Sequence, residues 1–470
     1  MSQRVYHKAA LPPLQEPDQS DEAWQEIVTT RLPAELEEQA RHLKAWTRKR
    51  GLERVSDVLR ALLVYAACDY SFRELGIWAV LKGIGSLSER AWRKRFQQSR
   101  AWIAWLLSSV LGSGQRPAWL PAHAQRILIV DATRFKTPGG TGDDVRLHQC
   151  YDLHSGRMVQ VQVTDRHQAE SLRHFTFQAG DLVVTDAGYP LASGVEETQE
   201  QQAGLVQRIS AFLVHLTNEQ GQVIALKEQV QGQVADSIRE LAAWIPLPHH
   251  AKRVQVRVLC YRLPDEQAKK ARARKEASLR KKYGKKFNQE RVWWAGWVLL
   301  VTTAPAEQWS ASDLMRLYRA RWQIELFFKR LKQVLSWHRI EFSDLQRATM
   351  LVQLKLLVWW LQEQEAQWMS ELFRGVLTAP AGKMTEVPCL PEEESEAEQG
   401  VWSQWTLAHM GYDEVRTTLR GAWSHQRTKQ CHEHLVRYIR SHPRKRGHQQ
   451  SEQRDWFRQR YASSPHSSTA

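Results

Sequence analysis

Short apolar runs alternate along this chain with segments of helical periodicity, and this pattern predicts a mixed α/β fold. Residues 127–130 and 182–184 are continuous apolar runs, which is typical of strands buried on both faces. Asp131 follows the first run, and Asp186 follows the second after one threonine. Each predicted strand therefore ends in a carboxylate, and Gly188 permits a tight exit from the second strand.

The segment between these two strands predicts a hairpin and then a short helix. Residues 146–153 and 157–164 alternate as strands across a turn that contains Gly156, and residues 168–175 predict the helix. Further along the chain, strands are predicted at residues 204–209, 211–216, 223–226, 254–261 and 297–302.

A later helix carries the most specific polar pattern of the chain. At 3.6 residues per turn, Tyr318, Arg321, Glu325 and Lys332 lie within an arc of roughly 60°. An adjoining apolar face can dock on a core, which leaves the polar face toward a cleft. That apolar face consists of Leu317, Ile324, Phe327, Leu331 and Leu335. A charged surface helix with no further role is the alternative interpretation.

The Tyr-x2-Arg-x3-Glu-x6-Lys spacing and the two aspartates resemble the DDE transposases of bacterial insertion sequences, specifically the insertion-sequence-four family. The resemblance covers roughly residues 20–360. It implies an α/β fold in which a mostly β insertion interrupts an RNase H-like catalytic core, with helical N-terminal and C-terminal domains. The 138 residues between Asp186 and Glu325 are too many for one crossover and fit such an insertion.

The resemblance also implies that Asp131, Asp186 and Glu325 form the catalytic, metal-binding triad. In such chemistry two Mg²⁺ ions about 3.5 to 4 Å apart assist both the attacking and the leaving oxygen. Mg²⁺ prefers carboxylate ligands, and we expect Mn²⁺ to substitute for it. Zinc fits poorly because the Cys and His residues lack paired spacing. Other acids that could compete, which we interpret as structural, are Asp143, Asp144 and Asp165.

In the same family-based interpretation, Tyr318, Arg321 and Lys332 contact DNA phosphates near the cut. Arg holds a phosphate through two N–H groups, whereas Lys acts as a point charge. Trp297, which opens a predicted strand, is expected to stack on a base flipped out of the duplex. Core packing is the alternative for Trp297 and for the two Trp residues shortly before it.

The charge of the chain favours a nucleic-acid partner. The formal net charge is +15 and the sequence pI is about 9.6. Between residues 269 and 286, ten of eighteen residues are Lys or Arg, which predicts a helix along the DNA backbone. The candidate contacts are Lys269, Lys270, Arg272 and Arg274, and a merely solvated helix is the alternative.

The N-terminal region is predicted to be helical. Residues 34–50, 55–68 and 71–82 are amphipathic, and a helix over 87–98 follows a short break. The last two segments have helix-turn-helix spacing, with Arg90, Arg93, Lys94 and Arg95 as candidate DNA contacts. Many helical hairpins of this kind bind nothing, which is the alternative. By resemblance, this domain binds the terminal inverted repeats of the element.

Eight segments are expected in order. They are a flexible N-terminus (1–21), a helical DNA-binding domain (22–120), the first part of the core (121–190), the β-rich insertion (191–304), the second part of the core (305–375), an acidic Pro/Glu linker (376–402), a helical block (403–441) and a basic disordered tail (442–470). Residues 344–373 are expected to continue as helix after the signature helix.

The sequence shows neither a signal peptide nor an apolar segment long enough for a bilayer, and five cysteines fit a reducing cytoplasm. Together with the resemblance, this implies a cytoplasmic, nucleoid-associated bacterial transposase without a membrane partner. It should bind double-stranded DNA as a homodimer assembled on the element ends. It should cut and join strands by a cut-and-paste route, and the nearest family members suggest a hairpin intermediate. The alternatives are a non-catalytic, transposase-derived DNA-binding protein and a metal-dependent nuclease on the same core.

Overall fold

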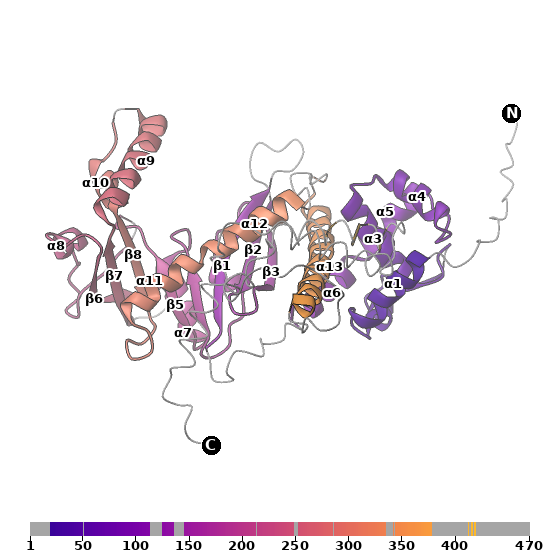
Figure 1. Ribbon diagram of the computed structural model, residues 1–470, viewed down its shortest axis with the longest axis horizontal. Helices are drawn as coiled ribbons and strands as arrows, with labels where there is room; N and C mark the ends of the chain where they lie inside the picture. The colour runs from indigo at the N-terminus through magenta and orange to yellow at the C-terminus, as the bar shows by residue number, and fades with distance from the viewer. Residues whose placement is uncertain are drawn as a thin grey trace, which may run out of the picture. The chain divides into compact units, whose positions relative to one another are not determined.

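The computed structural model describes residues 19–49, 51–112, 125–135, 145–212, 214–248, 252–284, 286–334, 342, 344–377, 412, 415, 416, 418 and 419. These residues form two compact units, coloured along the chain in Figure 1. One unit is helical, and the other contains the sheet between residues 125 and 328. Several predictions lie outside the described residues. They concern the N-terminus to residue 18, most of the segment after residue 377, Leu335 and the Asp143-Asp144 pair. The Lys332 side chain also lies outside the described part of the chain.

A sheet of eight strands organises the second unit, counted over the residues described there, in the order β3-β2-β1-β4-β5-β8-β7-β6. β1 pairs in parallel with β4, and β4 pairs in parallel with β5, whereas the other neighbours are antiparallel. The strands are β1 (Ile127–Phe135), β2 (Val145–Asp152), β3 (Arg157–Asp165), β4 (Leu182–Thr185), β5 (Gly204–Arg208), β6 (Ser237–Pro246), β7 (Arg253–Arg262) and β8 (Trp297–Thr302).

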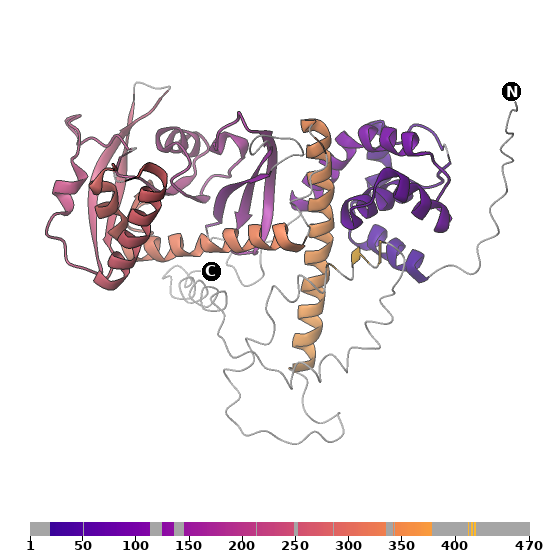
Figure 2. The ribbon, with the colours of Figure 1, turned by 90° about the horizontal axis from the view of Figure 1, so that it is seen from above.

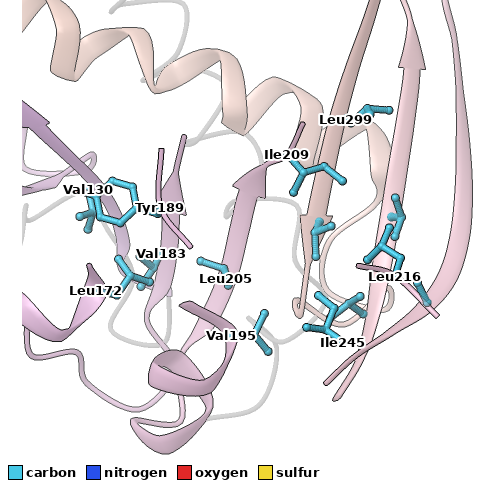
Figure 3. Close-up of a cluster of buried hydrophobic side chains, with 14 of the residues drawn as sticks. Val130, Leu172, Val183, Tyr189, Val195, Leu205, Ile209, Leu216, Ile245 and Leu299 are labelled. Atoms are coloured by element: carbon cyan, nitrogen blue, oxygen red, sulfur yellow. The ribbon is translucent and has the colours of Figure 1, made fainter. Parts of the chain in front are cut away.

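The buried apolar runs build the core of this sheet, as predicted. Val130, Val183 and Leu205, from three adjacent strands, are fully buried in one cluster (Figure 3). Helix α7 (Leu191–Glu200) contributes Val195 to the same cluster. Because side chains alternate along a strand, the face of β1 that carries Val130 is opposite to the face that carries Asp131.

Three local predictions in this unit need correction. β1 continues to Phe135, so Asp131 lies inside the strand rather than at its end. Residues 168–175 hold only one 3-10 turn, η1 (Leu172–His174), because Phe175 is extended and the backbone N–H of Thr176 donates to the side chain of Gln160. Residues 211–216 and 223–226 form no strand among the residues described there. Only isolated bridges at Thr217 and the short helix α8 (Leu226–Val230) occur in that region.

The strands that follow Asp186 join the same sheet. β5 pairs with β4, and β8 connects β5 to β7. β6, which the sequence pattern did not reveal, forms the far edge. Helix α9 (Asp265–Tyr283), α10 (Gln289–Trp293) and the 3-10 turn η2 (Trp294–Gly296) occupy the segment between β7 and β8, and α9 packs on η2.

The signature segment forms two helices, α11 (Ala311–Ala320) and α12 (Trp322–Val334), instead of the single predicted helix. The interruption is confined to Arg321, whose N–H donates to Tyr318 O and whose carbonyl accepts from Ile324, each three residues away. Arg321 keeps right-handed helical angles, so the turn tightens without a change of hand. The predicted apolar face is buried at Leu317, Ile324, Phe327 and Leu331.

The helical unit contains α1 (Gln19–Thr30), α2 (Leu36–His42), α3 (Val55–Cys68), α4 (Phe72–Leu81), α5 (Glu89–Gln98), α6 (Arg100–Gly112) and α13 (Leu345–Leu377). α3, α4, α5 and α13 confirm the predicted segments, whereas α2 is shorter than predicted and α1 and α6 were not predicted. α13, shown along its length in Figure 2, packs on α3 and α6. The described residues of the predicted block 403–441 are helical, and Tyr412 donates to Ala67 O at 2.8 Å.

Helix α5 presents fewer free cations than predicted. Arg95 is buried and donates to the carbonyls of Ala45 and Arg48, with its guanidinium over the Trp46 ring. Arg95 therefore connects α5 to the segment that contains Ala45 and Arg48, and it does not face solvent. None of the described helices has the length and apolar character needed to cross a membrane.

Candidate active site

The two candidate aspartates are brought together by strand register. Ile129 on β1 is paired with Val184 on β4 in parallel, and Asp131 and Asp186 each follow two residues later. The parallel pairing ends at Ile129, so both carboxylates lie where the two strands part. This is the place at which ligands commonly bind parallel sheets.

Arg321 connects Glu325 to Asp131. The guanidinium of Arg321 donates to Asp131 Oδ2 at 3.2 Å and to Glu325 Oε1 at 2.5 Å. Tyr318 lies beneath it, with the guanidinium 5.7 Å from the ring centre. Arg321 therefore contacts Asp131, Glu325 and Tyr318, whereas the sequence pattern predicted only a shared helix face for the signature residues.

Burial dominates the electrostatics of Asp131. Its side chain is 15% exposed, and burial raises its pKa from 3.8 to about 7. That value already includes four smaller effects: Asp186 and Glu170 raise the pKa, whereas the Ala132 N–H, at 2.7 Å from Oδ1, and Arg321 lower it. Burial lowers the pKa of the Arg321 guanidinium, but Tyr318, Asp131 and Glu325 together raise that pKa above its usual value.

The donor set suits a hard divalent cation, because it consists of carboxylate oxygens. Within the described part of the chain, no three Asp, Glu, His or Cys side chains converge closely enough to hold one metal ion. Arg321 is the cation shared by Asp131 and Glu325 in this arrangement. A metal bound by both carboxylates would therefore compete with the guanidinium of Arg321.

A pocket of about 350 Å³ lies beside the signature segment. Tyr318, Arg321, Arg208 and Trp322 line part of it. The Tyr318 hydroxyl is buried without a hydrogen-bond partner among the described residues, and Trp322 is 51% exposed. Arg208 and Trp322 were not predicted, although Trp322 directly follows Arg321 in the signature segment.

Trp297 lies in the core rather than on the surface. It is 5% exposed and packs on Trp293 and Trp294, with ring centres 5.2 and 6.0 Å away. The stacking of Trp297 on a flipped base therefore stays a prediction, and it would require these neighbours to move.

The α9 residues that were predicted to contact the DNA backbone divide into two groups. Lys269, Lys270 and Arg274 are exposed, whereas Arg272 is half-buried against Gly296. A Cβ on Gly296 would approach Arg272 Nη2 to 2.8 Å, so this guanidinium packs against the backbone of η2.

On α5, Lys94 is exposed and Arg93 is exposed but bound to Glu89 at 2.6 Å. An exposed ion pair one helical turn apart is weak, so Arg93 is not strongly held, and contact of Arg93 and Lys94 with DNA stays a prediction.

Two residues near the candidate triad were not predicted. Gln149 is paired with Asp131 across β1 and β2, is fully buried, and has no hydrogen-bond partner for its amide among the described residues. Glu170 raises the pKa of Asp131, which places it near the aspartates. No sequence signal marked either residue, because both positions depend on contacts between distant segments.

The chain belongs to the transposase DDE domain family, whose model matches residues 122–361. Its sequence is 29% identical over 307 residues to the putative transposase InsL for insertion sequence element IS186A of Escherichia coli (strain K12), covering 64% of this chain and 82% of the relative. It is 29% identical over 308 residues to the transposase for insertion sequence element IS421 of Escherichia coli, with the same coverage.

A third relative is the transposase for insertion sequence element IS231E of Bacillus thuringiensis subsp. finitimus, with 27% identity over 258 residues. That match covers 48% of this chain and 53% of the relative. The family match spans Asp131, Asp186, Arg321 and Glu325. The class of protein predicted from the signature spacing is therefore confirmed.

Proposed function

We propose that this chain is a DNA transposase that binds the terminal inverted repeats of an insertion sequence, cuts the DNA there and joins the freed ends to a target. One observation carries the proposal. Asp131 and Asp186 are adjacent by strand register, and Arg321 links Asp131 to Glu325, all inside the segment that matches the DDE domain family.

In this proposal Asp131, Asp186 and Glu325 hold Mg²⁺, with Mn²⁺ as a substitute. A bound pair of such ions supplies an activated oxygen nucleophile and stabilises the leaving oxygen. The order of β1 to β5 within the sheet, β3-β2-β1-β4-β5, supports an RNase H-like arrangement for this core.

Arg321 has two sets of partners in this function. It neutralises Asp131 and Glu325 in the present arrangement, and a DNA phosphate would offer the same bidentate geometry as a carboxylate. With DNA present, Arg321 would bind the phosphate, and Asp131 and Glu325 would then be free to hold the metal. The buried, unpaired hydroxyl of Tyr318 is a donor for the same phosphate, and Lys332 adds a point charge.

DNA held at the triad would extend to the basic surface of α9, through Lys269, Lys270 and Arg274, and Trp297 would receive a flipped base. Arg93 and Lys94 on α5 would contact the end sequence. Two protomers would assemble on paired ends. Cleavage would follow a cut-and-paste route through a hairpin intermediate, in which the first 3′-hydroxyl attacks the opposite strand.

The proposal is tested by cleavage of a short duplex that carries the terminal repeat from DNA flanking the gene, with and without Mg²⁺. Glu325→Gln should abolish cleavage and leave binding in a gel shift within about twofold, because the carboxamide keeps the shape of the side chain but loses its charge. Glu307→Gln, at an exposed loop position of the same unit, is the matched control and should cleave like the wild type.

The products distinguish the remaining classes of function. Joined products after Mg²⁺ addition support a transposase, whereas cleavage without joining would support a nuclease. Binding without cleavage by wild type would support a DNA-binding protein that has lost catalysis. Loss of binding in Glu325→Gln would assign Glu325 a structural role.

A further inference from the structure

Gln149 lies directly opposite Asp131 in the sheet. The two residues are paired between β1 and β2, and side chains at paired positions share one face of a sheet. Two residues further along β2, Tyr151 shares this face, and its ring centre lies 5.7 Å from that of Phe327 on α12. Gln149 is fully buried. Its amide therefore lies in the layer between the sheet and α12, beside the carboxylate of Asp131.

The amide of Gln149 has no hydrogen-bond partner at either end among the described residues. By contrast, the amide N–H groups of Gln233, another buried glutamine of this unit, donate to Ser237 O and Cys260 O at 2.8 and 2.9 Å. A buried amide without such bonds destabilises a fold, and an apolar side chain of the same shape would avoid that cost. Folding alone therefore gives no reason for an amide at position 149.

Asp131 has other donors in the present arrangement. Its Oδ1 accepts the Ala132 N–H at 2.7 Å, and its Oδ2 accepts from Arg321 at 3.2 Å. The Asp131 side chain is only 15% exposed, so water reaches it poorly. If Arg321 leaves for a DNA phosphate, Oδ2 loses its donor inside a buried site, which is unfavourable. The Gln149 amide is a buried donor on the same face that can replace it.

Arg321 has a second place for its guanidinium. Its side chain lines the pocket of about 350 Å³ together with Tyr318 and Arg208, and none of the described residues that line this pocket is acidic. A phosphate there would attract the guanidinium away from Asp131. The Nε of Arg321 is buried without a hydrogen-bond partner among the described residues, so its present position does not satisfy all of its donors.

We propose that Gln149 is a positioning residue for Asp131: its amide N–H donates to the Asp131 carboxylate when Arg321 leaves that carboxylate for a DNA phosphate. This proposal rests on the proposed function, since a DNA phosphate is the second partner of Arg321. The bond keeps the Asp131 side chain on its face of β1 after its first donor has gone. The cost of an unpaired amide in the DNA-free protein is offset in the DNA-bound protein.

The first test measures the thermal midpoint of the DNA-free protein by circular dichroism. Gln149→Met should leave the midpoint unchanged or raise it, because methionine fills a similar volume and removes the unpaired amide. Gln233→Met is the matched control, and it should lower the midpoint because it removes a donor from two backbone carbonyls. A clear fall in Gln149→Met would show that the amide already makes a bond without DNA, and it would overturn the proposal.

The second test measures affinity for the terminal-repeat duplex by fluorescence anisotropy, without divalent cations. Gln149→Met should bind about fivefold to tenfold more weakly than wild type, because it lacks the hydrogen bond that Asp131 gains with DNA. Gln233→Met should bind like the wild type at a temperature at which both are folded. In an Asp131→Asn background, Gln149→Met should weaken binding by less than about twofold, since the carboxylate is gone.

The outcomes separate this inference from the function on which it rests. A loss of affinity in Gln149→Met that disappears in the Asp131→Asn background supports the pairing of the two residues. Equal affinity of wild type and Gln149→Met overturns the role of Gln149 and leaves the proposed function standing, because Mg²⁺-dependent cleavage by wild type tests that function separately. The same loss in both backgrounds would also overturn the proposal, since Gln149 would then act on another group. A wild type that does not bind the duplex would overturn the proposed function itself.

Discussion

At the scale of single residues, the raised pKa of Asp131 gives a stability that depends on pH. The carboxyl ionises near 3.8 in the unfolded chain and near 7 in the folded chain. Its contribution to folding is therefore fully present below about pH 4 and is lost as the pH rises through about 7. A shift of this size corresponds to on the order of 4 kcal/mol.

Without divalent cations, the thermal midpoint of wild type should fall relative to that of Asp131→Asn as the pH rises from about 4 to about 8. Glu307→Gln, an exposed change, should follow the wild-type curve. Parallel curves for wild type and Asp131→Asn would show that Asp131 ionises normally in the folded protein.

Added Mg²⁺ should reverse part of this loss near neutral pH, because a cation favours the ionised carboxylate. The thermal midpoint of wild type should rise with Mg²⁺ concentration, and that of Asp131→Asn should rise much less. A differential scanning fluorimetry titration checks this, with Ca²⁺ and added NaCl as controls for general ionic effects. An equal rise in both proteins would place the bound cation elsewhere.

Residues with a local signature could be predicted from the sequence, and residues placed by distant contacts could not. Asp131 and Asp186 follow apolar runs, and Arg321 and Glu325 share a helical spacing, so each pattern lies within one segment. The loop before Glu170 is bonded to Arg146 and His174 through the carbonyls of Gln168 and Ala169, and backbone carbonyls carry no side-chain information. Its segment was predicted as a helix, which hid the loop that brings it to Asp186.

At the scale of elements, the basic helix α9 is the clearest candidate for a DNA-backbone contact. Replacing Lys269, Lys270 and Arg274 with Ala should weaken DNA binding and lower the slope of log K against log salt by up to about 3. A fluorescence anisotropy titration at several salt concentrations measures that slope. Arg272→Ala is the control on the same helix. It should lower the thermal midpoint and change the salt slope little, because Arg272 packs on Gly296. An unchanged slope in the triple variant would remove α9 from the interface.

Elements were predicted where burial imposes a strong pattern and missed where it does not. The fully buried β2 and the mixed β3 were both predicted as a hairpin, since the turn between them was also clear. β6 is buried only at Ala243 and Ile245 because it is an edge strand, and its pattern of apolar residues is correspondingly weak. The break at Arg321 could not be predicted, because a single tightened turn leaves the helical periodicity of the segment unchanged.

At the scale of the whole molecule, the order of the strands in the sheet could not be predicted from the sequence. The strands after Asp186 were predicted as a β-rich insertion, with no prediction of their partners, and β8 pairs with both β5 and β7, which makes the sheet continuous. The pairing of β5 with β8 joins residues about a hundred positions apart, and no local pattern specifies the register between them. The continuity matters for function, because it extends one rigid sheet from Asp131 and Asp186 to the strand that follows α9.

The proposed assembly of two protomers on paired ends predicts a specific mixing behaviour. If each protomer cuts one end, an equal mixture of wild type and Glu325→Gln should leave only about one quarter of the pairs able to cut both ends. Double-end release from a substrate with two ends should then fall about fourfold, while nicking at single ends falls only about twofold. Gel analysis of both products measures this ratio. Independent protomers, one bound at each end, would give the same fractions, so a substrate that carries only one end is the deciding comparison. Equal nicking of the one-end and two-end substrates by wild type would contradict assembly as a prerequisite for cleavage.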